Sequence, residues 1–150
     1  MARALSVIAL AATAIAIGAA SPAPITTRQG VFTEDQAAAG AQLYATRCAM
    51  CHGKMREGTY ETPSLQDRFI ANWSKAPVAD LYDYLARAMP QFAPGSLKPA
   101  ETAQIVAYLL KANGLPAGAK PLPEGGPTLA RIMLEPKAPS LSAKAVPRTK

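Results

Sequence analysis

The feature that most constrains this chain is a cluster of three reactive side chains. The 150 residues include two cysteines and one histidine, and all three fall within residues 48–52, in the order Cys-Ala-Met-Cys-His. Two cysteines are too few for a disulfide-rich scaffold, which needs several bridges. They also leave a structural zinc site one ligand short, since zinc normally takes four. The chemistry of the chain therefore depends on how these three neighbours are used together.

The spacing of Cys48, Cys51 and His52 is that of an attachment site for c-type haem. Two thiols three residues apart project from the same side of a helical turn, so both can reach the vinyl groups along one edge of a porphyrin. The imidazole of the next residue can then coordinate the iron from the face beneath. The pattern predicts one haem, held by two thioether bonds.

Two other uses of the cysteines are open at this point. A thiol–disulfide pair with this spacing normally follows a strand of a βαβ unit, whereas here it follows a helical pattern and leaves His52 without a role. A zinc site would need a carboxylate as its fourth ligand. A chance occurrence of the motif has a probability on the order of 10⁻⁴.

The second axial ligand of the iron decides between electron transfer and catalysis. A thioether gives six-coordinate iron, whereas an open position would bind small molecules. Met50 and Met55 lie too close to His52 along the chain to reach the opposite face of the ring, and Met133 lies near the C-terminus. Met89 is the remaining candidate; its alternative role is that of a core methionine that closes a helix.

Residues 1–20 predict export. Arg3 is the one charged side chain, residues 4–20 are apolar or small, and the run ends in Gly-Ala-Ala. These are the features of a signal peptide cleaved after about Ala20. An uncleaved membrane anchor is the alternative, since about 17 apolar residues reach the lower limit for spanning a bilayer. Either way we expect a folded part in the periplasm, an oxidising compartment in which c-type haem is assembled, and no stable membrane insertion after cleavage.

The charge distribution divides the rest of the chain. The net charge is +6, but residues 31–115 carry eight basic and eight acidic side chains, so no basic surface for nucleic acid is expected there. Residues 116–150 carry six basic against two acidic side chains and seven of the fourteen prolines. We expect residues 21–30 to be a leader, residues 31–115 to fold, and residues 116–150 to be a basic tail that favours extended or disordered conformations.

Residues 31–115 contain three helical patterns and no alternating strand pattern, which predicts an all-α domain. The first helix should begin after Thr33, in a capping box with Gln36. The second should run from near Pro77 to before Pro90, and the third from Pro99 to before Gly114. The expected apolar stripes are Ala37, Gly40, Ala41, Tyr44; Leu81, Tyr84, Leu85, Ala88; and Ile105, Tyr108, Leu109, Ala112.

Residues 31–115 resemble a class I c-type cytochrome. The likeness is carried by CAMCHG after a helix, by Met-Pro at positions 89–90, and by PGSL before a terminal helix. It implies about three main helices packed around a covalently attached haem, with His52 and Met89 as iron ligands.

The resemblance also assigns roles around the haem. It implies that Gly40 and Tyr44 on the first helix cross Tyr108 on the last, with the glycine allowing close approach. The carbonyl of Pro63, in the sequence TPSL, would accept the proton of the outer nitrogen of the ligating histidine. Trp73 would line the haem pocket and could donate to a propionate.

A narrower likeness concerns the partners. The chain resembles small cytochromes associated with periplasmic quinoprotein (PQQ) dehydrogenases in the segments WSKAPVADLYDYLARAMP, PGSL, YLLKANGLPAG and PLP. It departs from them at Lys98, where Ser or Thr is the more usual helix cap. The likeness implies a dehydrogenase as electron donor, and a terminal oxidase or another cytochrome as acceptor. No binding of nucleic acid is expected.

Two other functions remain possible from the sequence. The chain could be a permanently bound haem subunit of a larger oxidoreductase, with the basic tail as a docking strap and residues 128–134 lying on the domain or on a partner. It could also be a catalytic or gas-sensing haem protein with an open iron position. The basic residues of the tail are Lys120, Arg131, Lys137, Lys144, Arg148 and Lys150.

Overall fold

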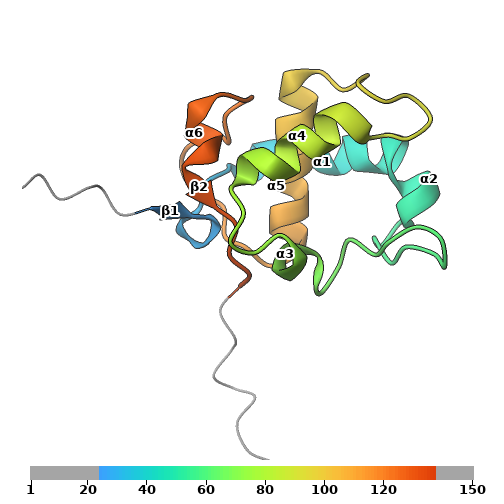
Figure 1. The fold of residues 1–150 in the computed structure, drawn as a ribbon, viewed down its shortest axis with the longest axis horizontal. Helices are drawn as coiled ribbons and strands as arrows, with labels where there is room; N and C mark the ends of the chain where they lie inside the picture. Colours follow the sequence, from blue (N-terminus) through green and yellow to red (C-terminus); the bar gives the residue numbers. More distant parts are fainter. Residues whose placement is uncertain (1–23, 138–150) are drawn as a thin grey trace, which may run out of the picture.

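The computed structural model describes residues 24–137 (Figure 1). The expected signal peptide, residues 1–20, lies outside the described residues. The elements are β1 (Ile25–Thr26), the 3-10 helix η1 (Thr27–Gln29), α1 (Glu34–Arg47), α2 (Ala49–His52), α3 (Phe69–Asn72), α4 (Val78–Ala88), α5 (Pro99–Ala112), α6 (Pro127–Ala130) and β2 (Ile132–Met133). The three long helices confirm the all-α class I cytochrome c fold, to which a two-residue strand pair is added. Within residues 24–137, no helix is long and apolar enough to span a bilayer.

The core of the fold is the crossing of α1 and α5, which depends on a glycine. A Cβ atom at Gly40 would lie 1.9 Å from the carbonyl oxygen of Gln104, so the two helix backbones are in direct contact there. One turn further on, the rings of Tyr44 and Tyr108 pack with centroids 5.1 Å apart. The predicted crossing is confirmed.

Of the two hydrogen bonds predicted for the capping box at the start of α1, one is present. The Thr33 hydroxyl accepts the amide proton of Gln36 at 3.2 Å, as expected. The Gln36 side chain does not turn back to the helix end. Its amide instead forms two hydrogen bonds with the backbone of Leu122, of 2.9 Å and 2.7 Å. The prediction was wrong there because Leu122 is buried, and its backbone groups need partners that water cannot supply.

The buried faces of α4 and α5 differ from the prediction at a few positions. Leu81 and Leu85 are buried as expected, but Tyr84 is 41% exposed and Tyr82 takes the inner position instead. The reason is the Tyr82 hydroxyl, which finds two carbonyl acceptors inside the fold. On α5, Ile105 and Leu109 are buried, while Tyr108 and Ala112 are partly exposed.

The largest departure concerns the tail, whose described part is packed and ordered against the helices. We call residues 116–136 the belt. Its buried side chains are Leu122, Leu129, Ile132 and Leu134, each at most 4% exposed. The expectation of a disordered tail was wrong for this part, because these four side chains are buried and the backbones of Leu122 and Glu135 are hydrogen-bonded to Gln36 and Thr27.

The belt closes on the residues expected to form a leader. β2 pairs in parallel with β1, with Ile25 opposite Ile132, so segments from both ends of the described chain lie side by side (Figure 1). The buried hydroxyl of Thr27 donates to the carbonyl of Glu135 at 2.9 Å and accepts from its amide at 3.0 Å. Phe32 is fully buried and accepts the amide proton of Gly118 at 2.7 Å. The packed unit therefore begins before residue 31 and ends well after residue 115.

Candidate cofactor site

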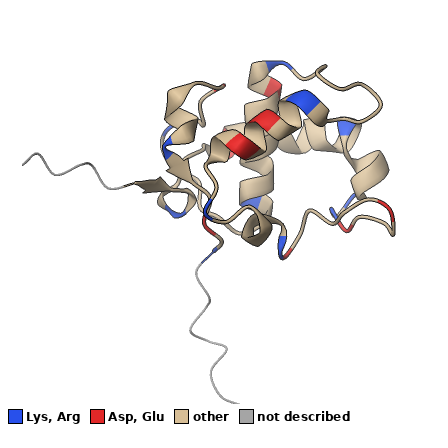
Figure 2. Cartoon of the chain, viewed as in Figure 1, with Lys and Arg blue, Asp and Glu red and all other residues tan. Residues whose placement is uncertain are grey.

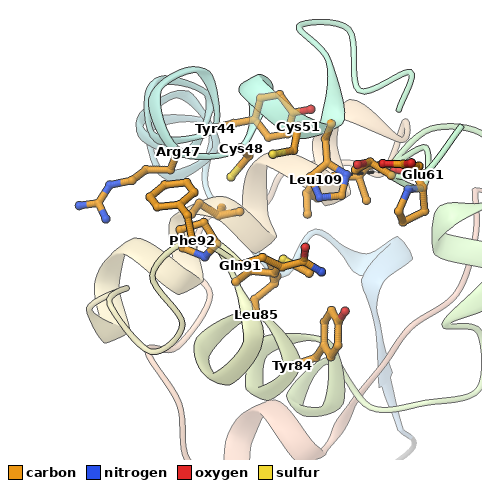
Figure 3. A pocket seen from close by; sticks show the side chains of 17 residues that line it. Tyr44, Arg47, Cys48, Cys51, Glu61, Tyr84, Leu85, Gln91, Phe92 and Leu109 are labelled. Atoms are coloured by element: carbon orange, nitrogen blue, oxygen red, sulfur yellow. Dashed lines mark hydrogen bonds between the residues drawn. The ribbon is translucent and has the colours of Figure 1, made fainter. Parts of the chain in front are cut away.

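A cavity is lined by residues that include Cys51 and His52 of α2. Figure 1 shows α2 at the end of the molecule opposite to β1 and β2. Figure 3 shows Tyr44, Cys48 and Cys51 on one side of it and Tyr84, Leu85 and Gln91 on the other. It encloses about 740 Å³ of empty space, part of which is open to solvent.

Both cysteines lie on the cavity because α1 passes almost directly into α2. Cys48 caps the end of α1, and its carbonyl accepts the amide protons of Cys51 at 3.1 Å and of His52 at 2.9 Å. The two thiols and the imidazole therefore belong to one helical turn. All three residues line the cavity, whereas Met50, between the cysteines, is 78% exposed.

The imidazole of His52 is oriented by Pro63. Its Nδ1 lies 3.0 Å from the Pro63 carbonyl oxygen, which is the contact implied by the cytochrome resemblance. A carbonyl only accepts, so Nδ1 carries the proton, and Nε2 of the neutral ring keeps a free lone pair. Pro63 also lines the cavity.

A second hydrogen bond fixes the turn that follows His52. The Tyr44 hydroxyl donates to the carbonyl of Gly53 at 2.7 Å. Gly53 has φ +80°, a left-handed conformation that favours glycine. Helix α1 is thus tied both to α5 and to the residue next to the histidine.

Met89 reaches the cavity from a different element. It caps the C-terminal end of α4, with its amide donating to the Leu85 carbonyl at 3.1 Å. Of the methionines in the described residues, Met89 alone lines the cavity. Met55 is 66% exposed, and Met133 lies in β2 at the other end of the molecule.

The structure does not bring Trp73 to the cavity wall. Its ring packs against that of Tyr84, with centroids 5.8 Å apart, and Tyr84 is the residue that lines the cavity. Trp73 therefore supports the wall from behind, and the implied hydrogen bond to a haem propionate has no direct support here.

Arg47, Glu61 and Tyr84 are among the cavity residues that were not identified as site residues from the sequence. Figure 3 shows Arg47 beside Phe92 on one side and Glu61 on another. Figure 2 shows the positions of basic and acidic residues distributed along the described part of the chain. Arg47 could have been identified from the sequence because it precedes Cys48. Glu61 and Tyr84 could not, because tertiary packing brings them to the cavity.

The environment of the thiols argues against the other uses of the cysteines. Burial raises the pKa of Cys48 to about 11, although the neighbouring Arg47 lowers it in part. Thiol–disulfide enzymes need a lowered thiol pKa. Within residues 24–137, no three His, Cys, Asp or Glu side chains are grouped so as to hold a metal ion, which disfavours zinc.

The cavity fits a c-type haem in the chemistry of its lining. It offers two thiols on one turn, an imidazole with a free Nε2, and a thioether from a separate helix end. Its remaining walls are largely apolar, which suits a porphyrin; they include Leu65, Leu85, Ile105, Leu109, Pro90 and Phe92.

Comparison with known proteins agrees with this description. Residues 35–109, half of the 150 residues, match the family described as cytochrome c oxidase, cbb3-type, subunit III. No curated protein matches significantly. A chain in the crystal structure of the sulfane dehydrogenase SoxCD from Paracoccus pantotrophus is 24% identical, with 94% of this chain and 84% of that chain covered and a TM-score of 0.56. That likeness concerns the fold.

Proposed function

This chain belongs to the family described as cytochrome c oxidase, cbb3-type, subunit III, a family of cytochrome c domains, and on that basis we propose that it is a periplasmic carrier of single electrons. We propose one haem, attached through Cys48 and Cys51 and ligated by His52 and Met89. The observation that supports this most strongly is the His52–Pro63 hydrogen bond of 3.0 Å at a cavity that also holds two thiols and a thioether.

The haem, when bound, supplies a redox centre that gains and loses one electron. The chain's own groups hold it. The two cysteines attach it covalently, which prevents its loss from a small domain. The Pro63 carbonyl accepts a hydrogen bond from Nδ1 of His52, which fixes the orientation of the ring and makes Nε2 the nitrogen that would ligate the iron.

The proposed role of Met89 is to keep the sixth position of the iron closed. A thioether raises the reduction potential and leaves no open site. The apolar walls formed by Leu85, Ile105 and Leu109 limit the access of water, which also affects the potential. These features favour electron transfer over catalysis.

The rim of the cavity suits brief contact with a redox partner. Met50 is 78% exposed and Phe92 is 60% exposed, and both lie at or beside the cavity. Arg47 supplies a positive charge on the Phe92 side (Figure 3). An apolar patch with modest charge favours fast and weak encounters.

The proposed donor is a periplasmic quinoprotein (PQQ) dehydrogenase, and the proposed acceptor is a terminal oxidase or another cytochrome. The support is the likeness of residues 73–90 and of the segments after them to cytochromes associated with such dehydrogenases. Reduction of the purified protein by a quinoprotein dehydrogenase and its alcohol, followed in a stopped-flow instrument, tests this assignment. Reduction no faster than that of an unrelated cytochrome would contradict it.

The second candidate is a permanently bound haem subunit of a larger oxidoreductase. The fold likeness to a chain in the structure of the sulfane dehydrogenase SoxCD favours this candidate. The idea of the tail as a docking strap loses support, since residues 128–134 carry buried side chains that face their own domain. Gel filtration of a native extract separates the candidates: a free carrier elutes near its own mass, and a subunit elutes with its enzyme.

Replacement of Met89 tests the ligand set. We expect Met89→Ala to lose the sulfur-to-iron charge-transfer band of the oxidised protein and to bind carbon monoxide when reduced, with the haem still attached. Met133→Ala, at the far end of the molecule, is the matched control and should keep the band. An unchanged band in Met89→Ala would remove Met89 from the site, and carbon monoxide binding by the unaltered protein would favour an open iron position.

A further inference from the structure

The hydroxyl of Tyr82 joins three segments at one buried point. The side chain is 7% exposed, and its oxygen lies 2.8 Å from the carbonyl oxygen of Glu124 in the belt and 3.2 Å from that of Pro99 at the start of α5. A hydroxyl has a single proton, so the two carbonyls share it. Without this proton the hydroxyl would no longer connect the belt to the start of α5.

The belt also holds the start of α4. The amide of Leu134 donates to the Ala76 carbonyl at 2.9 Å, and the amide of Lys75 donates to the Leu134 carbonyl at 3.1 Å. α6 packs on α4, with Leu129 fully buried between them. Helix α4 is therefore fixed along its first two turns, whereas its C-terminal cap, Met89, lies at the cavity.

The same hydroxyl restrains both ends of the segment that presents Met89. Residues 89–98 connect α4 to α5. Tyr82 belongs to α4, before this connection, and its hydroxyl donates to the carbonyl of Pro99, the first residue after it. Tyr82 lies about two turns, roughly 10 Å, before Met89 along the helix. A helix moves as a unit over that length, so a displacement at Tyr82 is carried to Met89.

We propose that Tyr82 and the belt act as a brace that positions Met89 in the cavity. The brace works through α4 and through the start of α5, and Tyr82 is a positioning residue rather than a ligand. The inference rests on the proposed function in that Met89 is the group whose position matters. It assigns to the C-terminal segment a role in the electron-transfer site at the opposite end of the molecule.

The test compares Tyr82→Phe with Tyr108→Phe in the full-length haem protein. Each variant removes one hydroxyl, and that of Tyr108 accepts a 2.7 Å hydrogen bond from Arg56 without contact to the belt. A typical hydrogen bond contributes enough that its loss shifts an equilibrium by about three- to tenfold. We expect Tyr82→Phe to bind imidazole at the iron three- to tenfold more tightly, while Tyr108→Phe stays within about twofold of the unaltered protein.

A second readout does not depend on the ligand to iron. Hydrogen exchange of the Met89 amide, which is bonded to Leu85, should accelerate by a similar factor in Tyr82→Phe only. Leu129→Ala, which opens the belt from a different position, should act in the same direction.

The outcomes separate the brace from the ligand assignment. If the unaltered protein shows the charge-transfer band and Tyr82→Phe equals it in imidazole binding and in exchange, the brace is wrong and the ligand assignment stands. Equal changes in both tyrosine variants would also overturn the brace, because they would indicate general loosening. If the unaltered protein lacks the charge-transfer band, Met89 is not an iron ligand. The brace then has no function at the iron, even if hydrogen exchange of the Met89 amide is faster in Tyr82→Phe.

Discussion

The two ends of this molecule differ in how their cores are filled. At the belt end, segments from both sides of the helical domain seal the fold, and Phe32, Leu122, Leu129 and Leu134 are each at most 1% exposed. At the cavity end, two cysteines, a histidine and a methionine surround about 740 Å³ of space between the helices. The chain completes its own core at one end and leaves the other end to be completed by a cofactor.

This difference indicates that the cavity end determines the properties of the haem and that the belt end contributes mainly to stability. Changes at the cavity end should alter the spectrum of the protein before they alter its stability. Changes at the belt end should lower the free energy of unfolding while the haem remains attached. The following predictions test that division, from the largest expected effect to the smallest.

Replacement of both cysteines should have the largest effect. The double variant Cys48→Ser and Cys51→Ser removes both sites of thioether formation, so we expect complete loss of covalent haem. Haem staining after denaturing electrophoresis measures this directly. The control is Leu129→Ala at the belt end, which should keep a full haem stain; loss of the stain in the control would mean that the two ends are not separable.

Gly40→Ala should strongly destabilise the fold. Its Cβ would lie 1.9 Å from the Gln104 carbonyl oxygen, so the backbones of α1 and α5 would have to separate. We expect a loss of about 3 kcal/mol or more in the free energy of unfolding, at the upper end of overpacking effects. Ala38→Gly, at an exposed position of α1, reverses the substitution and should cost about 1 kcal/mol. A Gly40→Ala variant as stable as the parent would show that the helices do not cross so closely.

Gln36→Ala should have an intermediate effect on the free energy of unfolding. It removes the two hydrogen bonds to the buried backbone of Leu122, for which we expect a cost of about 1–3 kcal/mol in urea unfolding. Gln42→Ala, on the exposed face of the same helix, should change the stability by less than about 0.5 kcal/mol. A shift of the haem spectrum in Gln36→Ala at neutral pH would be unexpected.

The smallest effect is a pH dependence at high pH. Burial, and then the nearby Tyr108, raise the pKa of Tyr44 to about 12. Because the fold favours the neutral phenol, this contribution to stability is complete below the unfolded pKa of about 10 and is lost as the pH rises toward 12. Urea unfolding at several pH values should show a steeper decline above about pH 10 for the parent than for Tyr44→Phe. Parallel declines would contradict the assignment.

The parts of the fold that could be predicted are those set by local sequence. The turn from Cys48 to His52 and the start of α1 after Thr33 each depend on neighbours within a few residues. The close approach at Gly40 was implied by the family resemblance instead. The family resemblance supplied Pro63 as the partner of the histidine, because TPSL follows the motif at a suitable distance.

Residues 128–134 were expected to lie on the domain or on a partner, but the rest of the belt could not be predicted, because its apolar residues follow no helical or strand period. Leu122 and Leu129 are separated by two prolines and two glycines, a composition typical of disordered segments. Their order comes from partners far along the chain: Gln36 lies 86 residues from Leu122. The exchange of Tyr84 for Tyr82 on the inner face of α4 has the same origin, since the carbonyl acceptors of Tyr82 come from α5 and from the belt.

The mass of the peptide that contains residues 48–52 tests the central claim most directly. The protein is matured in a host that attaches c-type haem, digested and examined by mass spectrometry. We predict that this peptide is heavier by one haem, with both cysteines inaccessible to alkylating reagents. A colourless protein whose peptide has the mass of the bare polypeptide, with two free thiols, would contradict the account.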